Sequence, residues 1–192
     1  MLNKEKFDKY LTQYLNDIIV LRNTFYLYKL IKTDNNCSIE KINKYSNLFI
    51  TIINSLLDSI ILRANKLFNE LEQKNINKMI KLCQNNIKYF KDKEEIYLKL
   101  KEFQKFISIK SKIINNIKSV RNKYSAHLDR KYFLENNKAF IDYSINNIEL
   151  EELIEETYNK TKKIYSMFQP IIIDDNTEEI RKDWINIINN TI

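Results

Sequence analysis

The residues best suited to chemistry gather in one short segment, Val120-Arg-Asn-Lys-Tyr-Ser-Ala-His127. His127 is the only histidine in the chain, and an imidazole can both accept and donate a proton near neutral pH. Arg121 carries a planar, permanently charged guanidinium that suits phosphate oxygens. Together they could cleave RNA without a metal. His127 would move protons at the 2′-hydroxyl or the leaving 5′-oxygen, and Arg121 would neutralise charge building up on phosphorus.

The spacing of this pair sets a geometric condition. On a continuous α-helix, steps of about 100° place Arg121 and His127 roughly 120° apart around the axis. Two arrangements would bring the side chains together: either the helix breaks between them, or two copies of the segment meet across a twofold dimer. The sequence leaves both open. A packed or helix-end histidine, flanked by Ala126 and Leu128, is the non-catalytic alternative.

The elements that must position this segment are helices. The chain has no glycine and one proline. P-loops and dinucleotide-binding turns are therefore excluded, because both are built from glycines. Helices would have to end on Asn or Lys instead. Apolar residues recur every three to four positions in six segments, at about residues 7–28, 42–72, 76–90, 93–124, 149–163 and 177–189. We expect an all-α protein: a single antiparallel bundle of four to six helices over residues 1–192, with residues 169–192 as a C-terminal helical extension.

Several segments make specific predictions. The first carries one apolar stripe, formed by Phe7, Leu11, Tyr14, Ile18, Leu21, Phe25 and Tyr28. The segment 93–124 is predicted to be one long helix that delivers Arg121 near its end. The fifth helix should stop at Pro170. The last should hold Trp184 and pack either on the bundle or on a second subunit.

Composition narrows the class of partner. A net charge of +7 favours RNA or DNA, although an AT-rich genome would also enrich lysine. Cys37 and Cys83 lack any ligand spacing and are expected to be reduced thiols, as in the cytoplasm. With one histidine, no zinc or di-iron site, and no other metal or cofactor, is expected. The N-terminus does not resemble a signal peptide. The apolar run from Phe49 to Leu62 is interrupted by polar residues, which favours a buried helix over a membrane span.

The Arg121–Asn122 pair and the spacing to His127 resemble the R-(N/D/H)-x-H-type signature of HEPN domains, a helical nucleotide-binding family. The abortive-infection, AbiU-type subgroup is similar over more of the chain. In that subgroup a long apolar helix like Leu56–Phe68 precedes an RNK-x-x-AH-x-D run, here Arg121–Asp129. The similarity spans about residues 5–168. Only the Arg121–Asp129 stretch is specific, and the remainder is helix order and apolar pattern.

The resemblance implies a metal-independent endoribonuclease that acts as a toxin or antiviral effector, with a composite cleft in a homodimer. It implies that His127 is the acid–base group, that Arg121 clamps the phosphate and that Asn122 orients the site. An antitoxin, either a nucleotidyltransferase or another small protein, would be a further partner. In some members the transferase modifies a tyrosine two residues before the histidine; Ser125 stands there in this chain.

The supporting residues have more modest expected roles. Asp129 would hold His127 or end the helix, and Lys123 and Arg130 would contact the RNA backbone. Tyr124 lies one step before the place of the modified tyrosine and continues the apolar line, so we expect it to pack in the core. Asp58 interrupts an apolar helix, where an unpaired charge is costly.

Asp58 is expected to pair with Arg63 or with a lysine of a neighbouring helix; facing the active cleft is the alternative. Two rival functions also stay open. One is a catalytically silent HEPN module that binds RNA or a protein partner. The other is an ordinary helical interaction protein whose apolar stripes pair with another chain.

Overall fold

The computed structural model describes residues 2–33, 45–125, 145–170 and 176–191, with only the backbone at 124, 125 and 188–191. Within these ranges the chain is helical and has no strand, which confirms the all-α class. The α-helices are α1 (Lys4–Thr33), α3 (Ser46–Phe68), α4 (Ile76–Asn85), α5 (Lys93–Ile109), α6 (Ser111–Val120), α9 (Asn147–Phe168) and α10 (Thr177–Thr191). Two short helices, η1 (Ile87–Tyr89) and η2 (Arg121–Ser125), complete the described elements.

Because the chain has no glycine, its helices end on other residues. No described residue has a positive φ, which is the conformation that glycine usually supplies after a helix. Asn69, Asn86 and Lys110 stand at the C-caps of α3, α4 and α5, as the composition predicted. Asn69 turns the chain by adopting extended backbone angles, φ −74° and ψ 121°.

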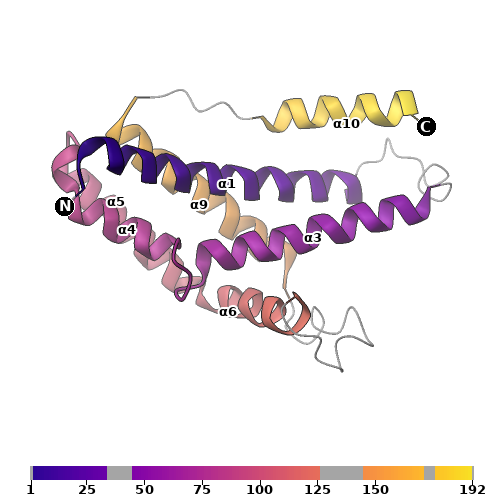
Figure 1. Cartoon of the computed structure of the whole chain (residues 1–192), viewed down its shortest axis with the longest axis horizontal. Coiled ribbons are helices and arrows are strands. Elements are labelled where there is room, and N and C mark those ends of the chain that lie inside the picture. The colour runs from indigo at the N-terminus through magenta and orange to yellow at the C-terminus, as the bar shows by residue number, and fades with distance from the viewer. Residues whose placement is uncertain (1, 34–44, 126–144, 171–175, 192) are drawn as a thin grey trace.

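Helix α1 is the centre of the bundle (Figure 1), and it packs against α3, α4, α9 and α10. All seven residues of its predicted apolar stripe are buried, so that prediction is confirmed. Phe7 at the start of α1 packs edge-on against Phe90 and Phe168, with ring centroids 5.8 and 5.0 Å away. The stripe therefore joins the two ends of the chain's helical core.

Polar contacts fix α9 on α1. The Nε atom of Arg22 donates to both carboxylate oxygens of Glu155, at 2.8 and 2.9 Å, and the guanidinium lies 4.5 Å from the ring centroid of Tyr158. A second ion pair joins Lys29 to Glu151. Because charge pairs and ring stacking both prefer one arrangement, these contacts set the register between the two helices.

The predicted end of the second helix, near residue 72, is wrong, because α3 ends at Phe68. Leu71, which the periodic pattern assigned to the apolar stripe, is 79% exposed. Asn75 explains the early end. Its side chain donates to the carbonyls of Glu70 and Glu72 and accepts from the backbone N–H of Lys78. These bonds close a turn before α4 and compete with helical bonding.

The predicted long helix over residues 93–124 is also divided. The structure has α5 and α6 instead, separated at Lys110, whose backbone angles are φ −82° and ψ 10°. The apolar spacing continues across the break from Ile107 to Ile113, and both are buried. Periodicity alone could not show the interruption, since the same stripe is buried on both sides of it.

The C-terminal helix α10 packs on the bundle, along α1 (Figure 1). Trp184 is buried and forms a small cluster with Ile31 of α1 and Phe49 of α3. The rings of Phe49 and Trp184 are nearly perpendicular, with centroids 6.2 Å apart. Of the two predicted locations for α10, the structure shows the one on its own bundle.

Helix α3 buries only one of its faces. It contacts α1, α4, α6 and η2, and yet Leu48, Ile50 and Leu62 are about half exposed, at 58%, 55% and 47%. By length and composition this helix is apolar enough to cross a membrane, and 22% of its most apolar window is buried. The expectation of a buried helix is therefore wrong for the outer face of α3. Among the described residues nothing covers this face, which mixes Leu48 and Leu62 with polar side chains such as Asn54, Ser55 and Arg63.

Candidate functional site

The candidate site begins where α6 changes its winding. Regular α-helix ends at Val120, and residues Arg121–Ser125 form the π-helical turn η2. A π-turn closes its hydrogen bonds from residue i to i+5 and is frequent at functional sites. The angle between Arg121 and His127 that an ideal α-helix would impose no longer applies. The α-helical geometry thus ends just before the predicted chemical segment.

Two of the predicted site residues are brought into contact. Arg121 and Asn122 are both half-buried, and Nη1 of Arg121 donates to Oδ1 of Asn122 at 3.1 Å. A guanidinium has five N–H donors, so this bond fixes one arm and leaves others to bind an anion. Asn122 therefore restrains one arm of the Arg121 guanidinium. The role that the resemblance implies for Asn122, orienting the site, stays a prediction.

Helix α3 supplies the neighbouring wall of the site, because it contacts both α6 and η2. The two helices run antiparallel (Figure 1), and Phe68 and Ser111 line one cavity between them. Residues 58 and 68 are ten apart, as are residues 111 and 121. Since each residue advances a helix by about 1.5 Å, we expect Asp58 at about the level of Arg121.

Neither expected kind of partner, Arg63 or a lysine of a neighbouring helix, pairs with Asp58 among the described residues. Arg63 donates from Nε to Oγ of Ser59, at 3.2 Å, and in the described ranges Asp58 forms no ion pair or hydrogen bond. Partial burial raises the pKa of the Asp58 carboxyl above its usual value of 3.8, because desolvation disfavours the charged form. The alternative expectation, a carboxyl directed to the cleft, stays a prediction.

The other predicted residues are less fully described. Lys123 is exposed, which its expected contact with the RNA backbone requires. For Tyr124 only the backbone is described. His127, Asp129 and Arg130 lie outside the described residues, so the distance from Arg121 to His127 stays a prediction. Among the described residues, no group of three or more His, Cys, Asp or Glu side chains could hold a metal ion.

Sequence comparison identifies the family of this fold. A family model described as AbiU2, a HEPN family, matches residues 4–181. The chain belongs to the AbiU2 family of HEPN domains. No curated protein and no solved structure matches it.

The matched span runs from the start of α1 into α10 and contains the whole Arg121–Asp129 segment. The resemblance to AbiU-type HEPN domains is thereby confirmed, and the chain is an abortive-infection HEPN module. Residues 169–181 of the predicted C-terminal extension also fall within the family match, and residues 182–192 lie beyond it.

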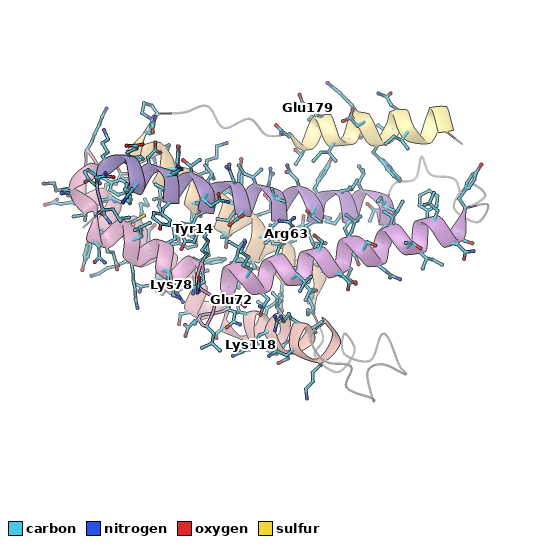
Figure 2. The ribbon with its side chains drawn as sticks, in the orientation of Figure 1. Tyr14, Arg63, Glu72, Lys78, Lys118 and Glu179 are labelled. Atoms are coloured by element: carbon cyan, nitrogen blue, oxygen red, sulfur yellow. The ribbon has the colours of Figure 1, made fainter. Side chains whose placement is uncertain are left out.

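The HEPN fold adds one feature to the site that the sequence analysis missed. Lys118 lies one helical turn before Arg121 on α6, and it lines a cavity that also receives Lys78 and Lys81 from α4. Figure 2 shows Lys118 on α6 and Lys78 beside Glu72, near the turn between α3 and α4. The three-residue spacing from Lys118 to Arg121 was the available signal, since residues at i and i+3 share a helix face.

Proposed function

We propose that the chain is a metal-independent HEPN endoribonuclease that acts as a toxin or antiviral effector of abortive infection. The observation that carries this proposal is the Arg121–Asn122 contact on the π-turn in a chain that belongs to the AbiU2 family. The net charge of +7 suits an RNA substrate.

The proposed reaction uses two charged groups in different roles. His127 takes the proton from the 2′-hydroxyl, and an imidazolium returns a proton to the leaving 5′-oxygen. The 2′-oxygen attacks phosphorus, the bond to the 5′-oxygen breaks, and a cyclic phosphate forms. Arg121 binds the phosphate oxygens and stabilises the charge that grows in the transition state. Asn122 restrains the guanidinium through its 3.1 Å bond, which reduces the orientational freedom lost on reaction.

We further propose that the cleft is completed by a second copy of the chain. Exposed apolar side chains of α3 support this, since Leu48, Ile50 and Leu62 are about half exposed on the helix that contacts η2. Apolar side chains that are exposed together on a surface often mark a site where another protein binds. A homodimer formed there would bring two Arg121–His127 segments close together. A protein antitoxin that neutralises the nuclease would be a further partner.

The test is cleavage of a fluorescent single-stranded RNA in the presence of a chelator. We expect cleavage by the wild type, and a loss of at least about 100-fold in His127→Ala and Arg121→Ala, since acid–base and transition-state charge terms contribute on this scale. Arg181→Ala, which removes an exposed arginine on α10, is the matched control. Cleavage that needs a divalent metal, or that survives His127→Ala, would contradict the proposal.

The runner-up is a catalytically silent HEPN module that binds RNA. The same net charge of +7 supports it, and so does the half-buried state of Arg121, which restricts access to its guanidinium. The two functions separate in one experiment: a silent module would bind the fluorescent RNA with micromolar affinity and leave it intact. Growth arrest on expression that persists in His127→Ala would favour this second function.

A further inference from the structure

A basic hollow of the described surface lies beside the candidate site. Its cavity volume is about 750 Å³, and it is bounded by α4, by the ends of α5 and α6 and by the turn after α3. Three lysines line it, namely Lys78, Lys81 and Lys118, against one carboxylate, Glu70. The other polar residues that line it are amides and serines: Asn69, Asn75, Asn77, Gln104, Ser108, Ser111 and Asn115. Such a lining offers hydrogen-bond donors and positive charge together.

Two lysines of this hollow differ from four lysines elsewhere on the bundle that form ion pairs. Lys29, Lys66, Lys110 and Lys160 each pair with a carboxylate of Asp or Glu. In the part of the chain that the structure describes, neither Lys81 nor Lys118 forms an ion pair or a side-chain hydrogen bond.

Two other groups of the hollow are already engaged. The Nζ atom of Lys78 donates to the carbonyl of Glu72 at 2.8 Å. One of its N–H donors is therefore used, but its positive charge is not neutralised. Glu70 accepts from Nδ2 of Asn77 at 3.2 Å, which gives the lone carboxylate a neutral partner. Positive charge therefore predominates in this hollow, which is the condition for holding an anion.

The hollow is continuous with the candidate site along α6. Its lining from α6 consists of Ser111, Ile114, Asn115 and Lys118, which follow the spacing of one helix face. The same face continues to Arg121, whose angles φ −55° and ψ −46° are still those of a right-handed helix. Arg121 lies about 15 Å along the axis from Ser111. A polyanion bound along this face would therefore pass from the hollow to the guanidinium.

The chemistry of the lining favours a sugar–phosphate backbone over bases. Specific recognition of unpaired bases relies on aromatic side chains for stacking. Among the described residues that line the hollow, Phe68 is the only aromatic one, and it is 2% exposed. Lysines and amides contact phosphate and ribose oxygens without reading sequence. The hollow thus fits the backbone of a nucleic acid and offers no platform for stacked bases.

We propose that this hollow is the substrate track of the domain: it holds the sugar–phosphate backbone of single-stranded RNA beside the phosphate that Arg121 binds. Lys118 and Lys81 make the phosphate contacts, and the amides of Asn115 and Gln104 bond to ribose or phosphate oxygens. The inference rests on the proposed function, because it takes RNA as the substrate. It adds a surface that positions the RNA on the domain without distinguishing one base sequence from another.

The test measures RNA binding apart from cleavage. Fluorescence anisotropy with a labelled single-stranded RNA is recorded at several salt concentrations, in the His127→Ala background so that the RNA stays intact. The double variant Lys81→Gln/Lys118→Gln is compared with Lys105→Gln/Lys112→Gln, which removes two exposed lysines of α5 and α6 outside the hollow. Thermal melting of each protein checks that the fold is kept.

We expect the Lys81/Lys118 variant to raise Kd about tenfold for any sequence, and to lower the slope of log K against log salt by about 1 to 2, because two counterion-releasing contacts are lost. The control should retain the parent slope. A parent-like Kd in the Lys81/Lys118 variant, an equal loss in the control, or an absence of RNA binding would overturn the track. Cleavage that fails while binding still depends on Lys81 and Lys118 would overturn the nuclease and leave the track standing.

Discussion

Arg121 and Asn122 are sequence neighbours whose side chains are joined by a 3.1 Å hydrogen bond from Nη1 to Oδ1. Adjacent residues of a regular helix point about 100° apart and rarely meet. The contact forms at the first residues of the π-turn η2. In the proposed nuclease it restrains the group that meets the phosphate, and it gives Asn122 a role that can be measured.

Asn122→Ala should lower kcat of RNA cleavage about tenfold and lower the thermal midpoint by no more than a few degrees. A hydrogen bond to a charged group contributes about 1.5–3 kcal/mol, and part of that orients Arg121 in the transition state. Asn122→Asp keeps the acceptor and should retain more activity than Asn122→Ala. Asn54→Ala, at an exposed position of α3, is the control. Wild-type kcat in Asn122→Ala would show that the contact does not position Arg121.

Asp58→Asn should stabilise the fold at neutral pH. The folded pKa of Asp58 is raised by desolvation, so the native state binds the proton more tightly than the unfolded state does. Its contribution is present below about pH 3.8 and is lost as the pH rises through the folded pKa. The amide removes this loss, so the thermal midpoint at pH 7 should be higher in Asp58→Asn than in the wild type, and the difference should disappear in acid. A lower midpoint at pH 7 would show that the carboxylate is paired.

The same Asp58→Asn protein tests whether the carboxyl serves the cleft. If the Asp58 carboxyl lies near Arg121 and takes part in cleavage, the cleavage rate should fall even though the stability of the fold rises. Such opposite changes are typical of active-site groups that are held at a cost to the fold. Unchanged cleavage in a more stable protein would leave Asp58 as a structural residue only.

Trp184→Ala should release α10 from the bundle. The ring is 7% exposed and lies in the small cluster with Ile31 and Phe49, so its loss should cost the docking of α10 about 3 kcal/mol. Hydrogen exchange should accelerate in α10 and change little in α1. Ile187→Ala, at a side chain that is 53% exposed, is the control. Equal acceleration throughout the chain would mean that α10 unfolds only with the whole domain.

The Cys83 thiol should resist alkylation in the native protein. Burial raises its pKa to about 12, and the thiolate is the reactive form. In a Cys37→Ser background, iodoacetamide at pH 8 should label Cys83 only after denaturant is added. Between about pH 9 and 12 the unfolded thiol ionises and the native one does not, so stability should fall as the pH rises through this window. Rapid native labelling would contradict the burial.

The sequence by itself determined the helical class and much of the core. A repeat of three to four residues has one physical meaning over a long segment, so the stripe from Phe7 to Tyr28 could be assigned to a buried face. Missing glycine excluded the phosphate-binding loops, and the types of Arg121, Asn122 and His127 named the chemistry. These conclusions are local: each depends on residues within a few turns of one another.

Tertiary structure decided where the local pattern was interrupted. The apolar stripe predicts a continuous helix across Lys110 and across Leu71. It gives no sign of the hydrogen bonds from the Asn75 side chain to backbone carbonyls, or of the break between α5 and α6. The basic hollow is a stronger case, because Lys81 and Lys118 lie on different helices, 37 residues apart in the chain. Periodicity places each lysine on its own helix, and only the packing of α4 against α5, with α6 following from α5, brings both to one cavity.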